Sequence, residues 1–121
     1  MSLLTGIHHV QFAMPHGGEP HARKFWIGVM GLKEMEKPAH LAVNGGCWFE
    51  GEGVSIHYGV EDAFMPARRA HPALLVENLG ALAAKLKASG VPFKPGKPLD
   101  GYRRGDIADP FGNRIELMER L

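Results

Sequence analysis

The chain has 121 residues, a length typical of one small domain and too short for a two-domain dehydrogenase or an eight-stranded α/β barrel. Hydrophobic residues make up 45% and charged residues 22%, which favours a folded core, and a formal net charge of +1 argues against general attraction to nucleic acid or anionic membranes. A single cysteine, Cys47, excludes an intramolecular disulfide, and no apolar run is long enough to span a bilayer. We therefore expect a small cytoplasmic protein.

Two segments of the chain begin alike and continue with the same order of predicted elements. Ile7–Met14 and Ala70–Val76 are predicted strands, and each is followed by a helix that ends at a glycine, Gly31 or Gly90. The remaining strands are predicted over Leu32–Lys37, Ala42–Phe49 and Val54–Gly59 in the first copy, and over Val91–Lys94, Tyr102–Ala108 and Arg114–Glu119 in the second.

The helices have apolar residues at helical spacing and recognisable ends. The first is predicted over residues 20–30, and the second begins after Asn78, a suitable N-cap. Residues 59 positions apart also correspond further along the chain, as Gly53 does with Gly112 and His57 with Glu116. We therefore predict an α+β fold of two βαβββ modules, about 5–60 and 69–121, within a single domain, with helices on the outer face of the sheets.

Period-2 alternation places four polar residues on the sheet faces turned away from the helices. These residues are His9, His57, His71 and Glu116. If the two modules pair about a pseudo-twofold axis, His9 meets His71 and His57 meets Glu116. A carboxylate buried among imidazoles needs a compensating cation, and this donor set suits a divalent Zn, Ni, Fe or Mn ion better than Ca.

Other polar residues have a structural or solvated role as the simpler interpretation. His8 falls on the opposite side of the first strand from His9, and Asp109 is placed to support a hairpin turn. Cys47 is expected to pack in the core. We expect His16, His21 and His40 to be solvated. Arg103, Arg104 and Arg114 are expected to form surface ion pairs or, alternatively, to bind a substrate carboxylate or phosphonate.

With its halves aligned, the chain resembles the vicinal oxygen chelate superfamily, which includes glyoxalase I, bleomycin-resistance proteins and extradiol dioxygenases. The resemblance runs from about Thr5 to Arg120. The segments that carry it are Gly6-Ile7-His8-His9-Val10, Phe25-Trp26 before Gly31-Leu32, Ala70-His71-Pro72-Ala73 and Asp109-Pro110-Phe111-Gly112-Asn113-Arg114-Ile115-Glu116.

The resemblance implies a cup-shaped mixed sheet built from both modules, with a divalent metal at its floor. It assigns metal ligands to His9, His71 and Glu116, and His57 stands where bacterial glyoxalase I-like enzymes have a glutamate. Glu116 would then have to leave the metal to act as the base, or His57 would have to carry the proton. The resemblance also implies a homodimer, in which a site could be shared between subunits.

These features predict a metal-dependent lyase or isomerase of the glyoxalase type, acting on a small molecule with adjacent oxygens. Glu116 and His57 are the candidate catalytic residues, and His9, His71, Glu116 and His57 are the candidate metal ligands. The alternatives are a metal-free protein that sequesters a flat ligand between Trp48, Phe49 and Tyr102, an Fe(II) extradiol-type dioxygenase, and a thiol transferase like those of fosfomycin resistance.

Overall fold

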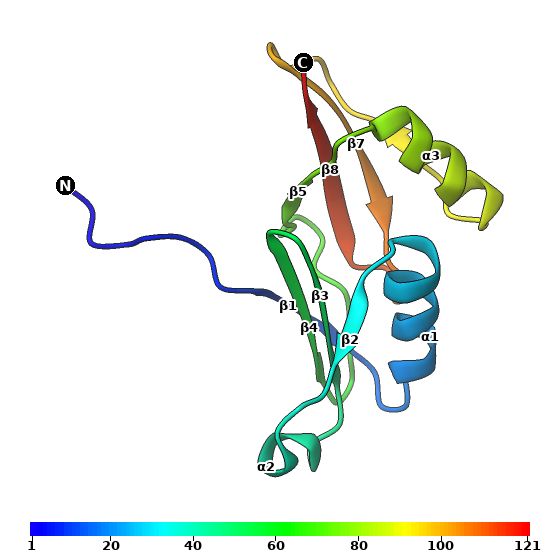
Figure 1. The fold of residues 1–121 in the computed structure, drawn as a ribbon. Coiled ribbons are helices and arrows are strands. Elements are labelled where there is room, and N and C mark those ends of the chain that lie inside the picture. The colour runs from blue at the N-terminus through cyan, green and yellow to red at the C-terminus, as the bar shows by residue number, and fades with distance from the viewer. The chain divides into compact units, whose positions relative to one another are not determined.

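The computed structural model describes residues 1–121, which divide into two compact units, Met1–Phe64 and Met65–Leu121. Each unit has a first strand, a helical segment and three further strands, and its four strands form one mixed sheet (Figure 1). The predicted α+β class with two βαβββ modules is therefore confirmed. No helix has the length and apolar character needed to cross a membrane.

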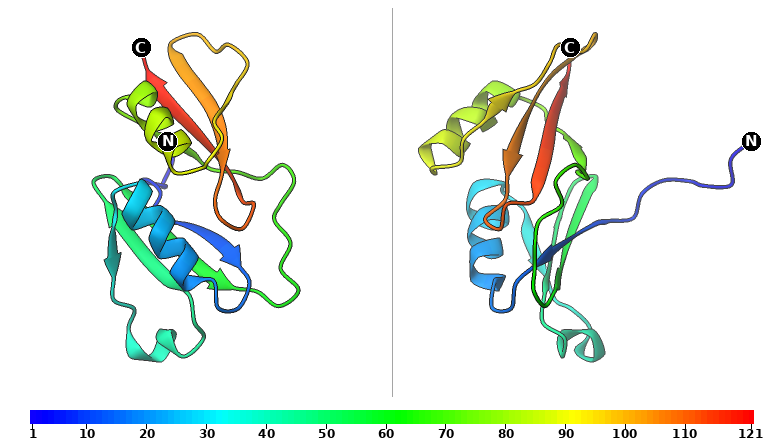
Figure 2. Two further views of the ribbon diagram at one scale, coloured as in Figure 1. Left: turned by 90° about the vertical axis from the view of Figure 1, so that its right-hand side faces the viewer. Right: turned by 180° about the vertical axis from the view of Figure 1, so that it is seen from behind.

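The first unit contains one sheet and three helical segments. Its elements are β1 (Val10–Met14), α1 (Glu19–Arg23), η1 (Lys24–Val29), β2 (Lys33–Met35), α2 (Ala39–Ala42), β3 (Cys47–Gly51) and β4 (Val54–Val60). The strand order is β1-β4-β3-β2, with β1 parallel to β4 and the other pairs antiparallel. The helical segment formed by α1 and η1 covers one face of this sheet (Figure 2).

The second unit repeats this arrangement with one longer helix. Its elements are β5 (Ala73–Leu75), α3 (Leu79–Ala88), β6 (Lys94–Pro95), β7 (Tyr102–Ala108) and β8 (Arg114–Arg120). The strand order is β5-β8-β7-β6, again with the first and last strands of the module parallel. The predicted cap of α3 is confirmed, because the Asn78 side chain accepts a hydrogen bond from the Ala81 amide at 3.0 Å.

Alternating apolar side chains bury one face of each sheet, as the sequence predicts. In the first unit Phe12 and Met14 of β1 and Ile56 and Tyr58 of β4 are buried. Trp26 of η1 packs with them, and its indole Nε1 donates a hydrogen bond to the Tyr58 hydroxyl at 2.9 Å. The buried polar ends of both rings therefore satisfy each other inside the aromatic core.

In the second unit, the core lies between α3 and β8. Leu79 and Leu86 of α3 and Ile115 and Leu117 of β8 are buried. Burying a side chain of this size stabilises the fold by about 1.5–3 kcal/mol. The opposite face of β8 carries Arg114, Glu116, Met118 and Arg120.

The first predicted helix, over residues 20–30, is not one regular helix. α1 continues as the π-helix η1, and the Met30 amide donates to the Phe25 carbonyl at 2.9 Å, five residues back. The neighbours Phe25 and Trp26 are both buried. A wider turn accompanies the burial of two adjacent large side chains on the same side of the helix, which helical spacing in the sequence does not reveal.

Four predicted strands, those that became β1, β3, β5 and β6, begin at least three residues later than expected. The strand predicted from Ala42 begins only at Cys47, and Ala42 is the last residue of α2. Gly45 and Gly46 lie between them with positive φ values of 75° and 89°, which interrupt the extended chain. β1 and β5 also begin at Val10 and Ala73. His9 therefore lies directly before β1, and His71 lies two residues before β5, so neither is within its strand.

Gly46 combines a left-handed backbone with a close approach to the neighbouring strand. A Cβ at this position would lie 2.3 Å from the Tyr58 carbonyl oxygen, whereas a Cβ at Gly53, with φ of 71°, would meet no atom within 4 Å. The two glycines therefore share a backbone conformation and differ in the space around it.

We expect Gly53→Ala to lower the free energy of unfolding by about 1–2 kcal/mol through backbone strain. Gly46→Ala should cost a further amount of about 1–3 kcal/mol, because the strand must also shift. Urea unfolding followed by tryptophan fluorescence measures both, since Trp26 and Trp48 lie in the same unit as the two glycines. Equal losses for the two variants would contradict the close approach at Gly46.

Candidate metal centre

The second unit brings His71 and Glu116 into contact. Glu116 lies on β8, and its backbone amide donates to the Pro72 carbonyl at 2.9 Å, which holds the segment before β5 beside it. The His71 Nε2 atom lies 3.1 Å from Glu116 Oε1. Two ligand atoms at about 2.1 Å from one cation lie roughly 3.0–3.4 Å apart, so this separation suits neighbouring ligands.

The contact made by His71 Nδ1 determines which atom of the ring carries the hydrogen, and therefore whether Nε2 can act as an acceptor. His71 Nδ1 lies 2.7 Å from the Arg69 carbonyl oxygen, which can only accept, so Nδ1 carries the hydrogen. In the neutral ring, Nε2 then presents a lone pair toward the Glu116 carboxylate. A proton or a metal cation is needed between these acceptors, and a carbonyl behind the distal nitrogen is the usual support of a metal-bound histidine.

Arg104 of β7 pairs with the other oxygen of Glu116. Arg104 NH1 lies 3.0 Å from Glu116 Oε2, and the Glu116 side chain is buried. Burial alone raises the pKa of Glu116, but the hydrogen bonds from Arg104 and His71 outweigh this effect and lower the pKa below its ordinary value. Glu116 is therefore ionised at neutral pH, with both oxygens engaged.

The first unit places His57 in an aromatic stack. The ring of His57 on β4 lies between Trp48, at 4.3 Å between centroids, and His9, at 3.9 Å, with interplanar angles of 11° and 14°. Burial, together with smaller electrostatic contributions from His9, His8 and Lys37, lowers the pKa of His57 to about 4. The ring is therefore neutral near pH 7, which is the form that binds a metal or accepts a proton.

His9 also contacts its neighbour in sequence. The Nδ1 atoms of His8 and His9 lie 2.9 Å apart, so one of the two rings carries its hydrogen on Nδ1 and the other accepts it. His8 is exposed and lies outside the sheet, so it is peripheral but not on the helix-covered face of a strand. The Nε2 atom of His9 is the nitrogen that could bind a metal ion.

The four predicted ligands thus form two pairs, His9 with His57 in the first unit and His71 with Glu116 in the second. Three or more His, Cys, Asp or Glu side chains do not gather around a common point. The donor chemistry nevertheless fits a borderline divalent cation, because it consists of imidazole nitrogens and an ionised carboxylate with supported orientations. No pair by itself completes a coordination shell.

The residues given structural roles behave largely as expected. His16, His21 and His40 are exposed, and His16 pairs with Asp62. Cys47 is buried, and burial raises the pKa of its thiol to about 11, so it is not a reactive nucleophile.

The contacts and burial of Asp109 and Phe49 show whether their predicted roles are correct. Asp109 accepts hydrogen bonds from the backbone amides of Phe111 at 2.9 Å and Asn113 at 2.8 Å, which confirms its role in the turn. Phe49 is wholly buried in the core and cannot form a ligand-binding wall, so that expectation is wrong. Its place on the apolar face of β3 explains the difference.

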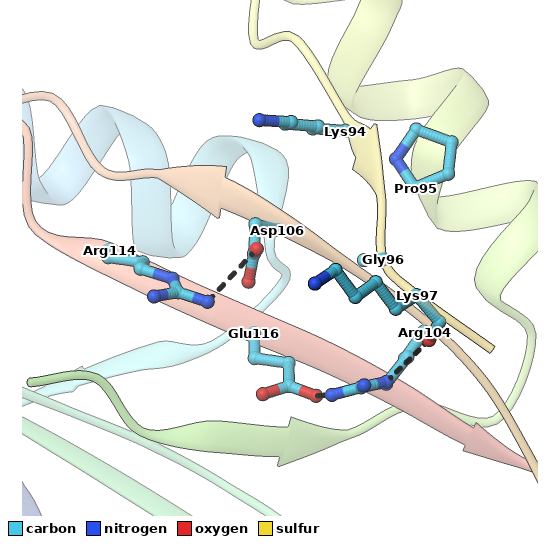
Figure 3. A pocket seen from close by; sticks show the side chains of 9 residues that line it. Lys94, Pro95, Gly96, Lys97, Arg104, Asp106, Arg114 and Glu116 are labelled. Carbon is cyan, nitrogen blue, oxygen red and sulfur yellow. Dashed lines mark hydrogen bonds and ion pairs between the residues drawn. The ribbon is translucent and has the colours of Figure 1, made fainter. Parts of the chain in front are cut away.

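A cavity of about 270 Å³ adjoins Glu116 on the second unit (Figure 3). Its lining comes from β6, β7, β8 and the link after β6. The residues are Lys94, Pro95, Gly96, Lys97, Arg104, Gly105, Asp106, Arg114 and Glu116. Arg114 NH2 lies 3.2 Å from Asp106 Oδ2, so both arginines of the cavity have carboxylate partners.

The contacts of Trp48 with His57 and of Arg104 with Glu116 were not predicted from the sequence, although strand register indicates both. Trp48 is directly opposite His57 in the β3–β4 pair. Arg104 is diagonal to Glu116 in the β7–β8 pair, because Asp106 is the direct partner of Glu116. Cross-strand neighbours on one face interact, so counting outward from each predicted turn would have indicated both contacts.

Comparison with protein families gives a match over almost the whole chain. A model of the Glyoxalase/Bleomycin resistance protein/Dioxygenase superfamily matches residues 2–117. The chain belongs to this superfamily. The structure is also similar to that of a Bacillus anthracis protein assigned to the glyoxalase family, with 40% sequence identity, a TM-score of 0.94, and coverage of 100% of this chain and 99% of that chain.

Two more distant structures share the fold. The fosfomycin resistance protein FosX from Listeria monocytogenes has 16% identity and a TM-score of 0.77, with 98% of this chain and 96% of that chain covered. The antibiotic binding protein TnmS3 from Streptomyces sp. CB03234 has 23% identity and a TM-score of 0.70, with 98% and 99% covered. A search of the curated proteins found no match.

We expect the stability of the metal-free protein to fall as the pH is lowered from about 6.5 to about 4. In this range the unfolded chain protonates His57 and the folded chain does not, so the unfolded state binds more protons. One such proton contributes at most about 1.4 kcal/mol per pH unit. Urea unfolding in a chelator at several pH values should show a weaker dependence in His57→Phe, with His40→Phe, an exposed histidine, as the control. An unchanged pH profile in His57→Phe would refute the cause assigned here.

Proposed function

We propose that this protein is a divalent-metal-dependent lyase or isomerase of the glyoxalase type, acting on a small molecule with adjacent oxygens. His9, His71 and Glu116 are the proposed ligands, and His57 is either a fourth ligand or, as argued below, the proton carrier. The two units act as one domain. The observation that carries the proposal is the contact between His71 Nε2 and Glu116 Oε1, with Nδ1 held by a carbonyl. This arrangement leaves two acceptor atoms that a cation would satisfy.

A bound divalent cation would supply polarisation of the substrate oxygens and stabilise negative charge that develops on them. The residues of the chain would bind the cation and transfer the proton. Glu116 has Oε1 against His71 and Oε2 against Arg104, so neither oxygen is free to take a proton from a substrate. Glu116 therefore acts as an ion-paired ligand.

His57 is the proposed proton carrier. Its Nε2 atom lies 3.5 Å from Ser55 Oγ, a weak hydrogen bond at most, and the ring is neutral near pH 7. The flanking rings of Trp48 and His9 hold its plane in place. A positioned neutral imidazole can accept a proton from carbon next to a polarised oxygen and return it to the neighbouring atom.

A second candidate function is metal-free binding of a flat molecule. The half-buried Trp48 ring, stacked on His57 with Lys37 5.9 Å from its centroid, provides an aromatic surface for such a ligand. Metal content and chelator sensitivity separate the two functions.

We expect the purified protein to bind one divalent metal per site after loading, as measured by elemental analysis following gel filtration. His71→Ala and Glu116→Ala should weaken metal binding by more than the roughly 10–100-fold that loss of a residue supporting a ligand costs, because each removes a direct ligand. His40→Ala, an exposed histidine on α2, is the matched control and should retain the metal.

Absence of stoichiometric metal under every loading condition would remove the enzymatic proposal. Thermal stabilisation by a ligand that persists in a chelator would then favour the second candidate function. Stabilisation that requires the metal would support the first.

We also propose a homodimer, and its subunits could share the site. If His9 and His57 of one chain meet His71 and Glu116 of the other, co-refolding inactive His9→Ala with inactive His71→Ala creates hybrid dimers with one intact site and one doubly altered site. Metal binding should then recover to roughly a quarter to a half of the wild-type level. With the site within one chain, the mixture should bind no more metal than either variant alone, and light scattering checks that dimers form.

A further inference from the structure

The cavity beside Glu116 is lined mainly by positive charge. Its charged residues are the cations Lys94, Lys97, Arg104 and Arg114 and the carboxylates Asp106 and Glu116. Glu116 pairs with Arg104 and Asp106 with Arg114, at 3.0 and 3.2 Å. Each carboxylate is therefore already neutralised by an arginine.

The two lysines have no such partner. Neither Lys94 nor Lys97 forms an ion pair or a side-chain hydrogen bond. Figure 3 shows the Lys97 side chain running across the cavity toward its centre. The cavity thus holds surplus positive charge that no side chain compensates.

The walls of the cavity allow a small ligand to approach the cations closely. Gly96 contributes no side chain to the cavity. Gly105 alternates with Arg104 and Asp106 along β7, and a Cβ there would lie on the other face of the strand, 2.3 Å from the Phe93 ring and 2.6 Å from the Lys94 carbonyl oxygen. Only glycine lets β6, with Lys94, pack this tightly against β7. Arg104 Nε also donates to the Lys97 carbonyl at 3.1 Å and anchors the link that carries Lys97.

Arg104 also has unused donors. One N–H of NH1 bonds to Glu116 and Nε bonds to the Lys97 carbonyl, and NH2 has no partner in the structure. Lysine ammonium groups and a partly paired guanidinium are the donors that recognise oxyanions. At about 270 Å³ the cavity suits a small head group more than a large ligand.

We propose that this cavity binds an oxyanion group of the substrate, a carboxylate or a phosphate or phosphonate, through Lys94, Lys97 and Arg104. The proposal rests on the proposed function in one respect: it assigns an anionic substrate to that activity. Binding of the anion itself requires only the second unit and no metal.

The test is a titration of the metal-free, full-length protein with inorganic phosphate, at constant ionic strength maintained with sodium chloride and followed by two-dimensional amide NMR. We expect saturable shifts at Gly96, Arg104 and Gly105. Lys97→Ala and Lys94→Ala should each weaken binding by roughly tenfold, since a hydrogen bond from a charged group changes an equilibrium constant by about that factor. Lys97→Arg should retain most of the affinity.

Lys85→Ala is the matched control, because it removes the same charge from an exposed position on α3 and should leave phosphate binding unchanged. Equal weakening by Lys85→Ala and Lys97→Ala, or shifts that chloride reproduces, would show general charge attraction and overturn the proposal. Absence of saturable phosphate and acetate binding would also overturn it. Unchanged circular dichroism and melting of each variant exclude misfolding as the cause.

Acetate titrated in the same way distinguishes the sources of the oxyanion. Tighter phosphate binding supports a phosphate or phosphonate group, and tighter acetate binding supports a carboxylate. Elemental analysis of Lys97→Ala separates this proposal from the metal centre. Lys97→Ala should keep its metal while oxyanion binding weakens. In the wild-type protein, metal binding without oxyanion binding would overturn the cavity assignment alone. Oxyanion binding by a wild-type protein that never takes up metal would leave the cavity assignment standing and remove the proposed enzymatic function.

Discussion

The placing of the candidate ligands in the second unit depends on the turn between β7 and β8. The Asp109 carboxylate accepts the amides of Phe111 and Asn113, and its second oxygen accepts the Asn113 side-chain amide at 2.8 Å. These bonds determine the register in which Asp106 faces Glu116. A slip of one residue would turn Glu116 toward the helix and its apolar neighbours toward the cavity. The turn contains no candidate ligand, yet it orients the candidate ligands of the second unit.

The two units provide different environments for their polar residues. In the second unit, Glu116 is buried as an anion because Arg104 and His71 compensate its charge. In the first unit, His57 is buried as a neutral ring because its neighbours are aromatic or positively charged. An anionic side chain and a neutral imidazole are the two kinds of group that the metal centre proposed above would require. Two units of the same topology thus hold buried polar residues of opposite electrostatic character.

Much of the fold could be predicted because hydrophobic alternation and turn residues act locally. The strands Tyr102–Ala108 and Arg114–Arg120 were predicted almost to the residue, since the turn between them is rich in residues that favour tight turns. The interruption before Cys47 was missed, because it results from backbone angles of Gly45 and Gly46 that composition alone does not reveal. The π-helical turn at Phe25 and Trp26 was missed for a similar reason: its width reflects packing on the sheet.

The sequence alone determined the class of fold, the residues on each face of the strands and the residue types available for a metal, because period and residue chemistry are local properties. Tertiary structure decided which of these residues touch. It placed Arg104 on the free oxygen of Glu116, the Arg69 carbonyl behind His71, and His57 between two rings. Those contacts join residues from separate strands and loops, so they follow from register and packing and cannot be obtained from spacing along the chain.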